Sequence, residues 1–130
     1  MDKKVSIILS TYNEAIVIEK TINEIFKSIE NVEIVLVDDN SEDGTLEKVK
    51  SINNKNLKII SRNSRGLASA FLLGMINTNG DYVGWIDSNM PQLIPLFREM
   101  LKKLDECDIV LLSRYVRGGG DQRSKMRILS

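Results

Sequence analysis

The chain has 130 residues, of which 42% are hydrophobic and 28% are charged, and its 18 basic and 18 acidic residues cancel. This length allows one domain with a real core, and the balanced charge argues against binding to nucleic acid. The single cysteine and the lack of histidine exclude an internal disulfide and argue against a zinc site. Because the sequence has neither a signal-like start nor a run of about 18 apolar residues, we expect a cytoplasmic protein.

Short apolar runs that suit buried strands alternate along the chain with segments of helical periodicity. The predicted strands are Val5–Leu9, Val35–Val37, Leu57–Ile60, Tyr82–Ile86 and Ile109–Leu112. The predicted helices are Glu14–Ile29, Asp43–Ile52, Gly66–Ile76 and Pro91–Leu104. In the first helix we expect Ile16 on the buried face and consider Asn13 as the N-cap. This alternation predicts an α/β fold with a doubly wound, mostly parallel sheet.

Each predicted strand ends in a cluster of polar residues. The clusters are residues 10–14, 38–45, 61–63, 87–89 and 113–115. Open parallel sheets bind their ligands at the carboxyl ends of the strands. The five clusters therefore predict one binding site, at one edge of the sheet, for a polar and phosphorylated ligand.

Three familiar nucleotide-binding architectures lack their motifs here. The glycine pattern of a dinucleotide-binding domain does not follow the first strand, where residues 11–14 read TYNE. The P-loop pattern is absent from the chain. In a flavodoxin-like receiver domain the acidic pair follows the first strand, whereas Asp38 and Asp39 follow the second.

The order and spacing of six motifs resemble family-two glycosyltransferases, and most closely the polyprenol-phosphate mannosyltransferase and glucosyltransferase branch. The motifs are STYNE at 10–14, VDDNSEDGT at 37–45, RGLASA at 65–70, GDYV at 80–83, DSN at 87–89 and SRY at 113–115. The resemblance implies a GT-A, Rossmann-like sandwich with helices on both faces of the sheet. It also implies that residues 1–130 form one nucleotide-sugar-binding domain, truncated before the acceptor portion of the family.

By this resemblance, the first two polar clusters and the basic turn after the third strand bind a nucleotide. Asp38 and Asp39 would hold the base and ribose, although either could instead cap the following turn, which is the role we favour for Asp43. The other implied nucleotide contacts are Thr11, Tyr12, Glu14, Arg62, Gly66 and Asp87. For the turn at 62–65, a solvated basic loop is an equally good interpretation.

The motif at 87–89 stands where the family has Asp-x-Asp, which binds a divalent cation. Asp87 and Asn89 are therefore the implied ligands of Mg²⁺ or Mn²⁺, with an amide in place of the second carboxylate. Asp87 and Arg114 are the implied catalytic residues. Arg114, Lys125 and Arg127 are implied to bind the acceptor phosphate, the last two near a membrane surface.

The implied reaction is inverting transfer of a hexose from a UDP- or GDP-linked sugar to a polyprenyl phosphate, at the inner face of the membrane. The chain has no histidine to act as a general base. A phosphate monoester has a second pKa of about 6, so it is already an anion and needs no base. The alternative is a nucleotide-sugar binding module without transferase activity, which Asn89 and the short chain favour.

Overall fold

A computed structural model describes residues 3–113. The chain divides after Arg98 into two compact units, and the first contains the whole sheet. The elements are β1 (Val5–Thr11), α1 (Ile18–Ser28), β2 (Val32–Asp38), α2 (Thr45–Lys50), β3 (Leu57–Ser61), α3 (Leu67–Met75), β4 (Tyr82–Trp85), the 3₁₀ helix η1 (Pro91–Leu96) and α4 (Phe97–Lys103). The proposal that residues 1–130 form a single domain stays a prediction.

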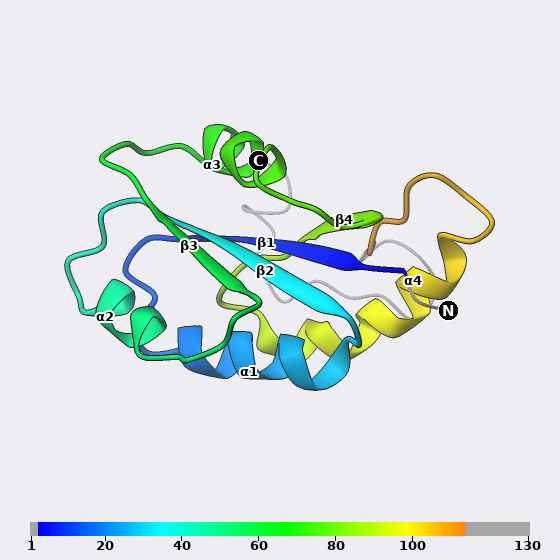
Figure 1. The fold of residues 1–130 in the computed structure, drawn as a ribbon, viewed down its shortest axis with the longest axis horizontal. Coiled ribbons are helices and arrows are strands. Elements are labelled where there is room, and N and C mark those ends of the chain that lie inside the picture. Colours follow the sequence, from blue (N-terminus) through cyan, green and yellow to red (C-terminus); the bar gives the residue numbers. More distant parts are fainter. Residues whose placement is uncertain (1–2, 114–130) are drawn as a thin grey trace, which may run out of the picture. The chain divides into compact units, whose positions relative to one another are not determined.

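The sheet has four strands in the order β3-β2-β1-β4, and every pair is parallel. Helix α3 covers one face, while α1, α2 and η1 lie on the other (Figure 1). This arrangement confirms the predicted parallel α/β sheet with helices on both faces. Parallel strands end at the same edge, so the segments after β1, β2, β3 and β4 emerge together.

The two central strands form the core. All seven residues of β2 and six of the seven in β1 are buried. One face receives Ile18, Ile22 and Ile25 from α1, each fully buried and each contributing about 1.5–3 kcal/mol of hydrophobic stabilisation. On the other face, α3 approaches so closely that a Cβ on Gly74 would lie 2.5 Å from Ile8 Cγ2.

The loop before β4 is fixed at the amino edge of the sheet by a buried carboxylate. Glu33 Oε1 accepts hydrogen bonds of 2.6 Å from Ser6 Oγ and from the backbone N–H of Asn79. Its Oε2 lies 3.3 Å from Lys4 Nζ and 3.7 Å from Lys58 Nζ. The Glu33 side chain is only 4% exposed, so these partners compensate a buried charge.

Helix α1 begins later than the sequence pattern predicts. The turn at 15–17 precedes it, Val17 is the N-cap, and Ile16 is fully exposed rather than buried. Asn13 has a positive φ of 54° and is not the cap. Its side-chain oxygen instead accepts the N–H of Glu42, so the loop between β1 and α1 is held by the loop after β2.

Two further segments differ from expectation. The predicted helix 91–104 begins as the 3₁₀ helix η1, since Pro95 has no N–H and obstructs α-helical geometry. Residues 109–112 do not form the predicted strand: no strand pairs with them among residues 3–113, and Ile109 and Leu111 are 75% and 82% exposed. A strand requires a paired neighbour. Within the same range, no helix is long and apolar enough to cross a membrane.

Candidate functional site

A cleft of about 410 Å³ lies at the carboxyl edge of the sheet. The ends of β1 and β2, the start of α3 and the loop after β4 line it. The lining residues are Ser10, Thr11, Tyr12, Glu14, Asp39, Arg65, Gly66, Leu67, Asp87, Ser88 and Asn89. Of the five polar clusters predicted to meet, those at 10–14, 38–45 and 87–89 contribute residues to this cleft, whereas the cluster at 61–63 contributes none. The predicted strand before the fifth cluster is not formed, and residues 114–115 lie outside the described residues.

Asp38 is an internal anchor of this edge. Its side chain is fully buried, and Oδ1 accepts hydrogen bonds from Thr11 Oγ1 at 2.8 Å and Ser41 Oγ at 2.6 Å. The other oxygen, Oδ2, accepts the N–H of Ser41 at 3.0 Å. Asp38 does not line the cleft, so in this structure it shapes the edge by joining the ends of β1 and β2.

Asp39, by contrast, lines the cleft and pairs with Arg62. The guanidinium donates from Nε to Oδ1 at 2.6 Å and from Nη2 to Oδ2 at 3.1 Å, a two-point pairing. Hydrogen bonding to the Asp39 carboxylate raises the pKa of Arg62 above its already high value. Arg62, predicted to contact the nucleotide, does not line the cleft and directs its donors to the protein.

The ring of Tyr12 faces a different arginine. The Arg65 guanidinium carbon lies 3.6 Å from the centre of the ring, a cation–π contact. Arg65 lines the cleft, but its position in a basic turn did not distinguish it from Arg62 in the sequence. In the sequence, the feature that could have singled out Arg65 is its place directly before Gly66. In the structure, Gly66 is exposed, has a φ of 133° and lines the cleft.

Asp43 has a structural role, as we favoured, although the N-cap of α2 is Gly44 and not Asp43. Its Oδ1 accepts the N–H of Thr45 at 3.1 Å, the first residue of α2, and its Oδ2 accepts the N–H of Ala15 at 3.1 Å. The hydrogen bond from the Thr45 hydroxyl contributes most to holding the pKa of Asp43 below its usual value. This carboxylate therefore fixes two loops and is not part of the cleft.

Glu14 and Asp87 form the negative part of the cleft. Burial raises the pKa of Glu14, and the charges of Asp43 and Asp87 raise it further. A raised carboxyl pKa means that its negative charge is under-compensated, which a bound cation would relieve. This part of the cleft is therefore electrostatically suited to a positive ligand.

A divalent cation fits the donor atoms present. Asp87 offers a carboxylate and Asn89 an amide oxygen, both on residues that line the cleft and are exposed to it. Within residues 3–113 no group of three or more acidic, histidine or cysteine side chains is arranged to enclose a metal. That is compatible with Mg²⁺-type sites, which use one or two carboxylates and complete the shell with water and substrate phosphates.

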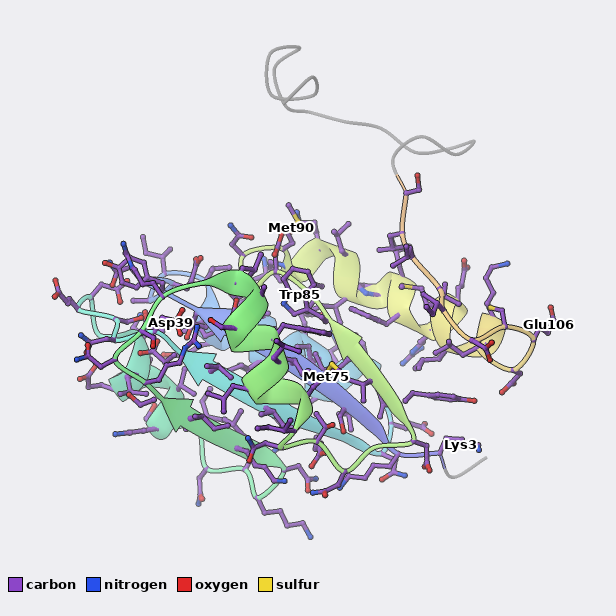
Figure 2. The ribbon with its side chains drawn as sticks, turned by 90° about the horizontal axis from the view of Figure 1, so that it is seen from above. Lys3, Asp39, Met75, Trp85, Met90 and Glu106 are labelled. Carbon is purple, nitrogen blue, oxygen red and sulfur yellow. The ribbon has the colours of Figure 1, made fainter. Side chains whose placement is uncertain are left out.

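The structure thus brings Thr11, Tyr12, Glu14, Asp39, Gly66, Asp87 and Asn89 together, and places Asp38 and Arg62 directly behind the cleft wall. Figure 2 shows Asp39 on the side of the sheet where the β2 arrow ends. Arg114, Lys125 and Arg127, expected to bind acceptor phosphate, lie outside the described residues.

Among known proteins, the chain is similar in sequence to dolichol-phosphate mannosyltransferases. The chain is 38% identical over 123 residues to a dolichol-phosphate mannosyltransferase of Pyrococcus furiosus, covering 89% of this chain and 34% of the relative. It is 30% identical over 131 residues to the dolichol-phosphate mannosyltransferase of Saccharomyces cerevisiae, covering 92% and 48%. The chain therefore spans between a third and a half of these relatives.

A solved mannosyltransferase from Pyrobaculum calidifontis, in complex with GDP-Man and Mn²⁺, superposes with a TM-score of 0.62 at 28% identity. The match covers 68% of this chain and 28% of that one. Its similarity supports the predicted GT-A fold. The sequence profile of glycosyl transferase family 2 matches residues 6–130, nearly the whole chain. On this match, and on the strand-end motifs that meet in the cleft, the chain belongs to glycosyl transferase family 2.

Proposed function

We propose that the cleft is the donor site of a glycosyltransferase that moves a hexose from a nucleoside-diphosphate sugar to a polyprenyl phosphate. The observation that carries the proposal is the convergence of Tyr12, Asp39 and Asp87 on one cleft. The Tyr12 ring suits the face of the base. The Asp39 carboxylate, held by Arg62, suits the N–H groups of the base, and the acidic region around Asp87 suits a cation-bound diphosphate.

The base would lie against Tyr12 and Arg65. Tyr12 is 40% exposed, so its ring offers apolar area to a planar ligand, and Arg65 already stacks on one face. Asp39 can accept an N–H of either guanine or uracil, so this carboxylate alone does not choose between GDP- and UDP-sugars. Glu14 and Thr11 are the proposed contacts to ribose, and Gly66 lets the backbone approach the ligand.

The diphosphate would lie toward Asp87 and Asn89, which would hold Mg²⁺ or Mn²⁺. The bound cation would stabilise the charge that develops on the departing nucleoside diphosphate. This chain contributes the negative field that recruits the cation, from Glu14 and Asp87. Asn89 adds a ligand oxygen without adding charge.

The proposed acceptor is that suggested by the relatives, two of which are dolichol-phosphate mannosyltransferases. The sequence contains no histidine, and a phosphate acceptor does not require one. A phosphate oxygen attacks as an anion and needs no proton removed. We propose that Arg114, Lys125 and Arg127 bind that phosphate, at the cytoplasmic face of a membrane, where a polyprenyl chain is anchored.

A nucleotide-sugar binding module without transfer activity is the second candidate. It is favoured by Asn89, an amide in the metal motif where the resemblance implies a second carboxylate. Titration of GDP-mannose, UDP-glucose, GDP and UDP by calorimetry, with and without Mn²⁺, tests the donor site. Release of free sugar and transfer to a short polyprenyl phosphate then separate the two candidates. Mn²⁺-dependent turnover supports the transferase, whereas binding without turnover supports the module; no binding of any nucleotide contradicts both.

A further inference from the structure

All three guanidinium nitrogens of Arg62 donate hydrogen bonds to other groups of the protein. Besides the pair with Asp39, Nη1 donates to Ser69 Oγ at 3.0 Å and Nη2 donates to the Gly66 carbonyl at 2.8 Å. Only 14% of the side chain is exposed. Four hydrogen bonds therefore hold one side chain in a single geometry.

These bonds connect two walls of the cleft. Asp39 directly follows β2. Gly66 directly precedes α3, and Ser69 lies in the first turn of that helix. Asp39 and Gly66 both line the cleft, while Arg62 stands behind them. The Gly66 carbonyl also accepts the N–H of Ala70, so the arginine is tied to the helix through its backbone.

We infer that Arg62 is a positioning residue for nucleotide binding: it fixes the orientation of the Asp39 carboxylate and the separation between Asp39 and Gly66. This inference rests on the proposed donor site. A carboxylate oxygen can accept two hydrogen bonds, so the pairing with Arg62 leaves one acceptor position on each oxygen of Asp39. The arginine thus restricts how Asp39 meets the base without contacting the base itself.

Lysine cannot replace this arrangement. An ammonium group is a single point of charge, whereas the guanidinium is a planar fork that reaches Asp39, Gly66 and Ser69 at once. Arg62→Lys keeps the charge beside Asp39 and loses the geometry. A purely electrostatic role would be rescued by lysine, and a positioning role would not.

The test measures binding of GDP, UDP and pyrophosphate in the presence of Mn²⁺ for wild type, Arg62→Lys and Arg62→Gln. Both variants should bind the nucleoside diphosphate that wild type prefers about tenfold more weakly, with pyrophosphate affinity unchanged. Arg98→Gln is the matched control, because Arg98 donates to the Ser28 carbonyl, away from the cleft, and should bind as wild type does. Circular dichroism checks that each variant is folded.

A double-mutant cycle with Asp39→Asn separates positioning from direct contact. If Arg62 acts largely through Asp39, Arg62→Gln should weaken binding much less in the Asp39→Asn background than in wild type. Equal losses in both backgrounds, an equal loss of pyrophosphate binding, or full rescue by lysine would each overturn the inference. Should Arg62→Gln not fold, Arg62→Lys and Ser69→Ala remain, and wild-type affinity in both overturns it. Absence of nucleotide binding by wild type would instead refute the proposed function.

Discussion

Glu33 at the amino edge of the sheet and Glu14 at its carboxyl edge are both carboxylates removed from bulk water, but their surroundings shift the pKa in opposite directions. At the amino edge, Glu33 is buried, and both of its oxygens face donors from Ser6, Asn79 and two lysines. Burial alone would raise the pKa of Glu33, but the hydrogen bonds from Ser6, Asn79 and Lys4 and the charge of Lys4 together lower it. At the carboxyl edge, burial and neighbouring acids raise the pKa of Glu14.

The opposite pKa shifts distinguish a carboxylate that stabilises the fold, Glu33, from one that is available to a ligand, Glu14. The charge of Glu33 is satisfied within the protein, and the loop before β4 depends on it. Burial and neighbouring acids disfavour the charge of Glu14 beside an open cleft, so a cation bound there would relieve it. Substitutions of Glu33 and of the loop it fixes should therefore change stability alone, whereas substitutions of residues that line the cleft should chiefly change binding.

The largest stability effect is expected from Glu33→Gln. The amide oxygen can still accept from Ser6 and Asn79, but an NH₂ group then faces Lys4 and Lys58. We expect a loss of about 2–3 kcal/mol in the free energy of unfolding at pH 7, measured by urea denaturation. The native pKa of Glu33 is below its unfolded value, so wild type gains this stability above the unfolded pKa. The advantage over the variant should disappear as pH falls through the lowered native pKa; an unchanged difference in acid would contradict the assignment.

Gly80→Ala tests the amino edge of the sheet by placing a methyl group against Ser6. A Cβ at this position would lie 2.5 Å from Ser6 Oγ and 2.7 Å from the Ser6 backbone nitrogen, which cannot move without disturbing β1. The expected loss is about 1–3 kcal/mol of stability, measured by thermal and urea unfolding. Nucleotide affinity of the folded fraction should stay at the wild-type value, and a selective loss of affinity would break the comparison between the edges.

At the carboxyl edge, Asn89→Asp should change binding with a sign that depends on metal. With Mn²⁺, the added carboxylate supplies charge and a ligand oxygen, so the affinity for the metal in the presence of nucleoside diphosphate should rise several-fold, up to about tenfold. Without metal, the same carboxylate should repel the diphosphate and weaken its binding. Calorimetry in both conditions measures this. An effect of the same sign in both would mean that residue 89 does not contact the cation.

The smallest expected effect is the pH dependence at Glu14. Its native pKa is raised above the ordinary value of 4.5, so the folded state favours the protonated form more than the unfolded state does. Relative to Glu14→Gln, wild type should lose stability as pH rises from below 4.5 through the raised native pKa, by less than about 1 kcal/mol, and then stay constant. Urea unfolding across this range provides the measurement. A relative gain of wild type with rising pH would show that the charge of Glu14 is compensated after all.

The sequence predicted the parallel sheet well, and also the edge of the sheet at which the cleft lies, because both depend on local patterns. Buried β-branched runs identify β1 and β2, and parallel strands necessarily deliver their polar ends to one edge. Ile16 was misassigned because helical periodicity continues into the turn at 15–17, whose geometry is set by long-range bonds such as Ala15 N–H to Asp43. The prediction of a strand at 109–112 was wrong for a related reason: an apolar run does not by itself provide a neighbouring strand to pair with.

The roles of individual polar residues were harder to predict. Asp38 and Asp39 are adjacent and chemically identical, yet one is an internal anchor and the other lines the cleft, since successive side chains of an extended segment point in opposite directions. Arg62 and Arg65 lie in one short turn, and only their three-dimensional partners assign Arg62 to Asp39 and Arg65 to Tyr12.

Hydrogen–deuterium exchange with and without nucleoside diphosphate and Mn²⁺ tests the central claim, that the carboxyl edge is the donor site, most directly. Protection on binding should appear in residues 10–14, 38–41, 62–67 and 86–89, where the four segments meet around the cleft. The loop at 77–81, at the opposite edge, should exchange at the same rate in both states. Protection at 77–81 without protection at the cleft, or no protection anywhere at saturating ligand, would contradict the account.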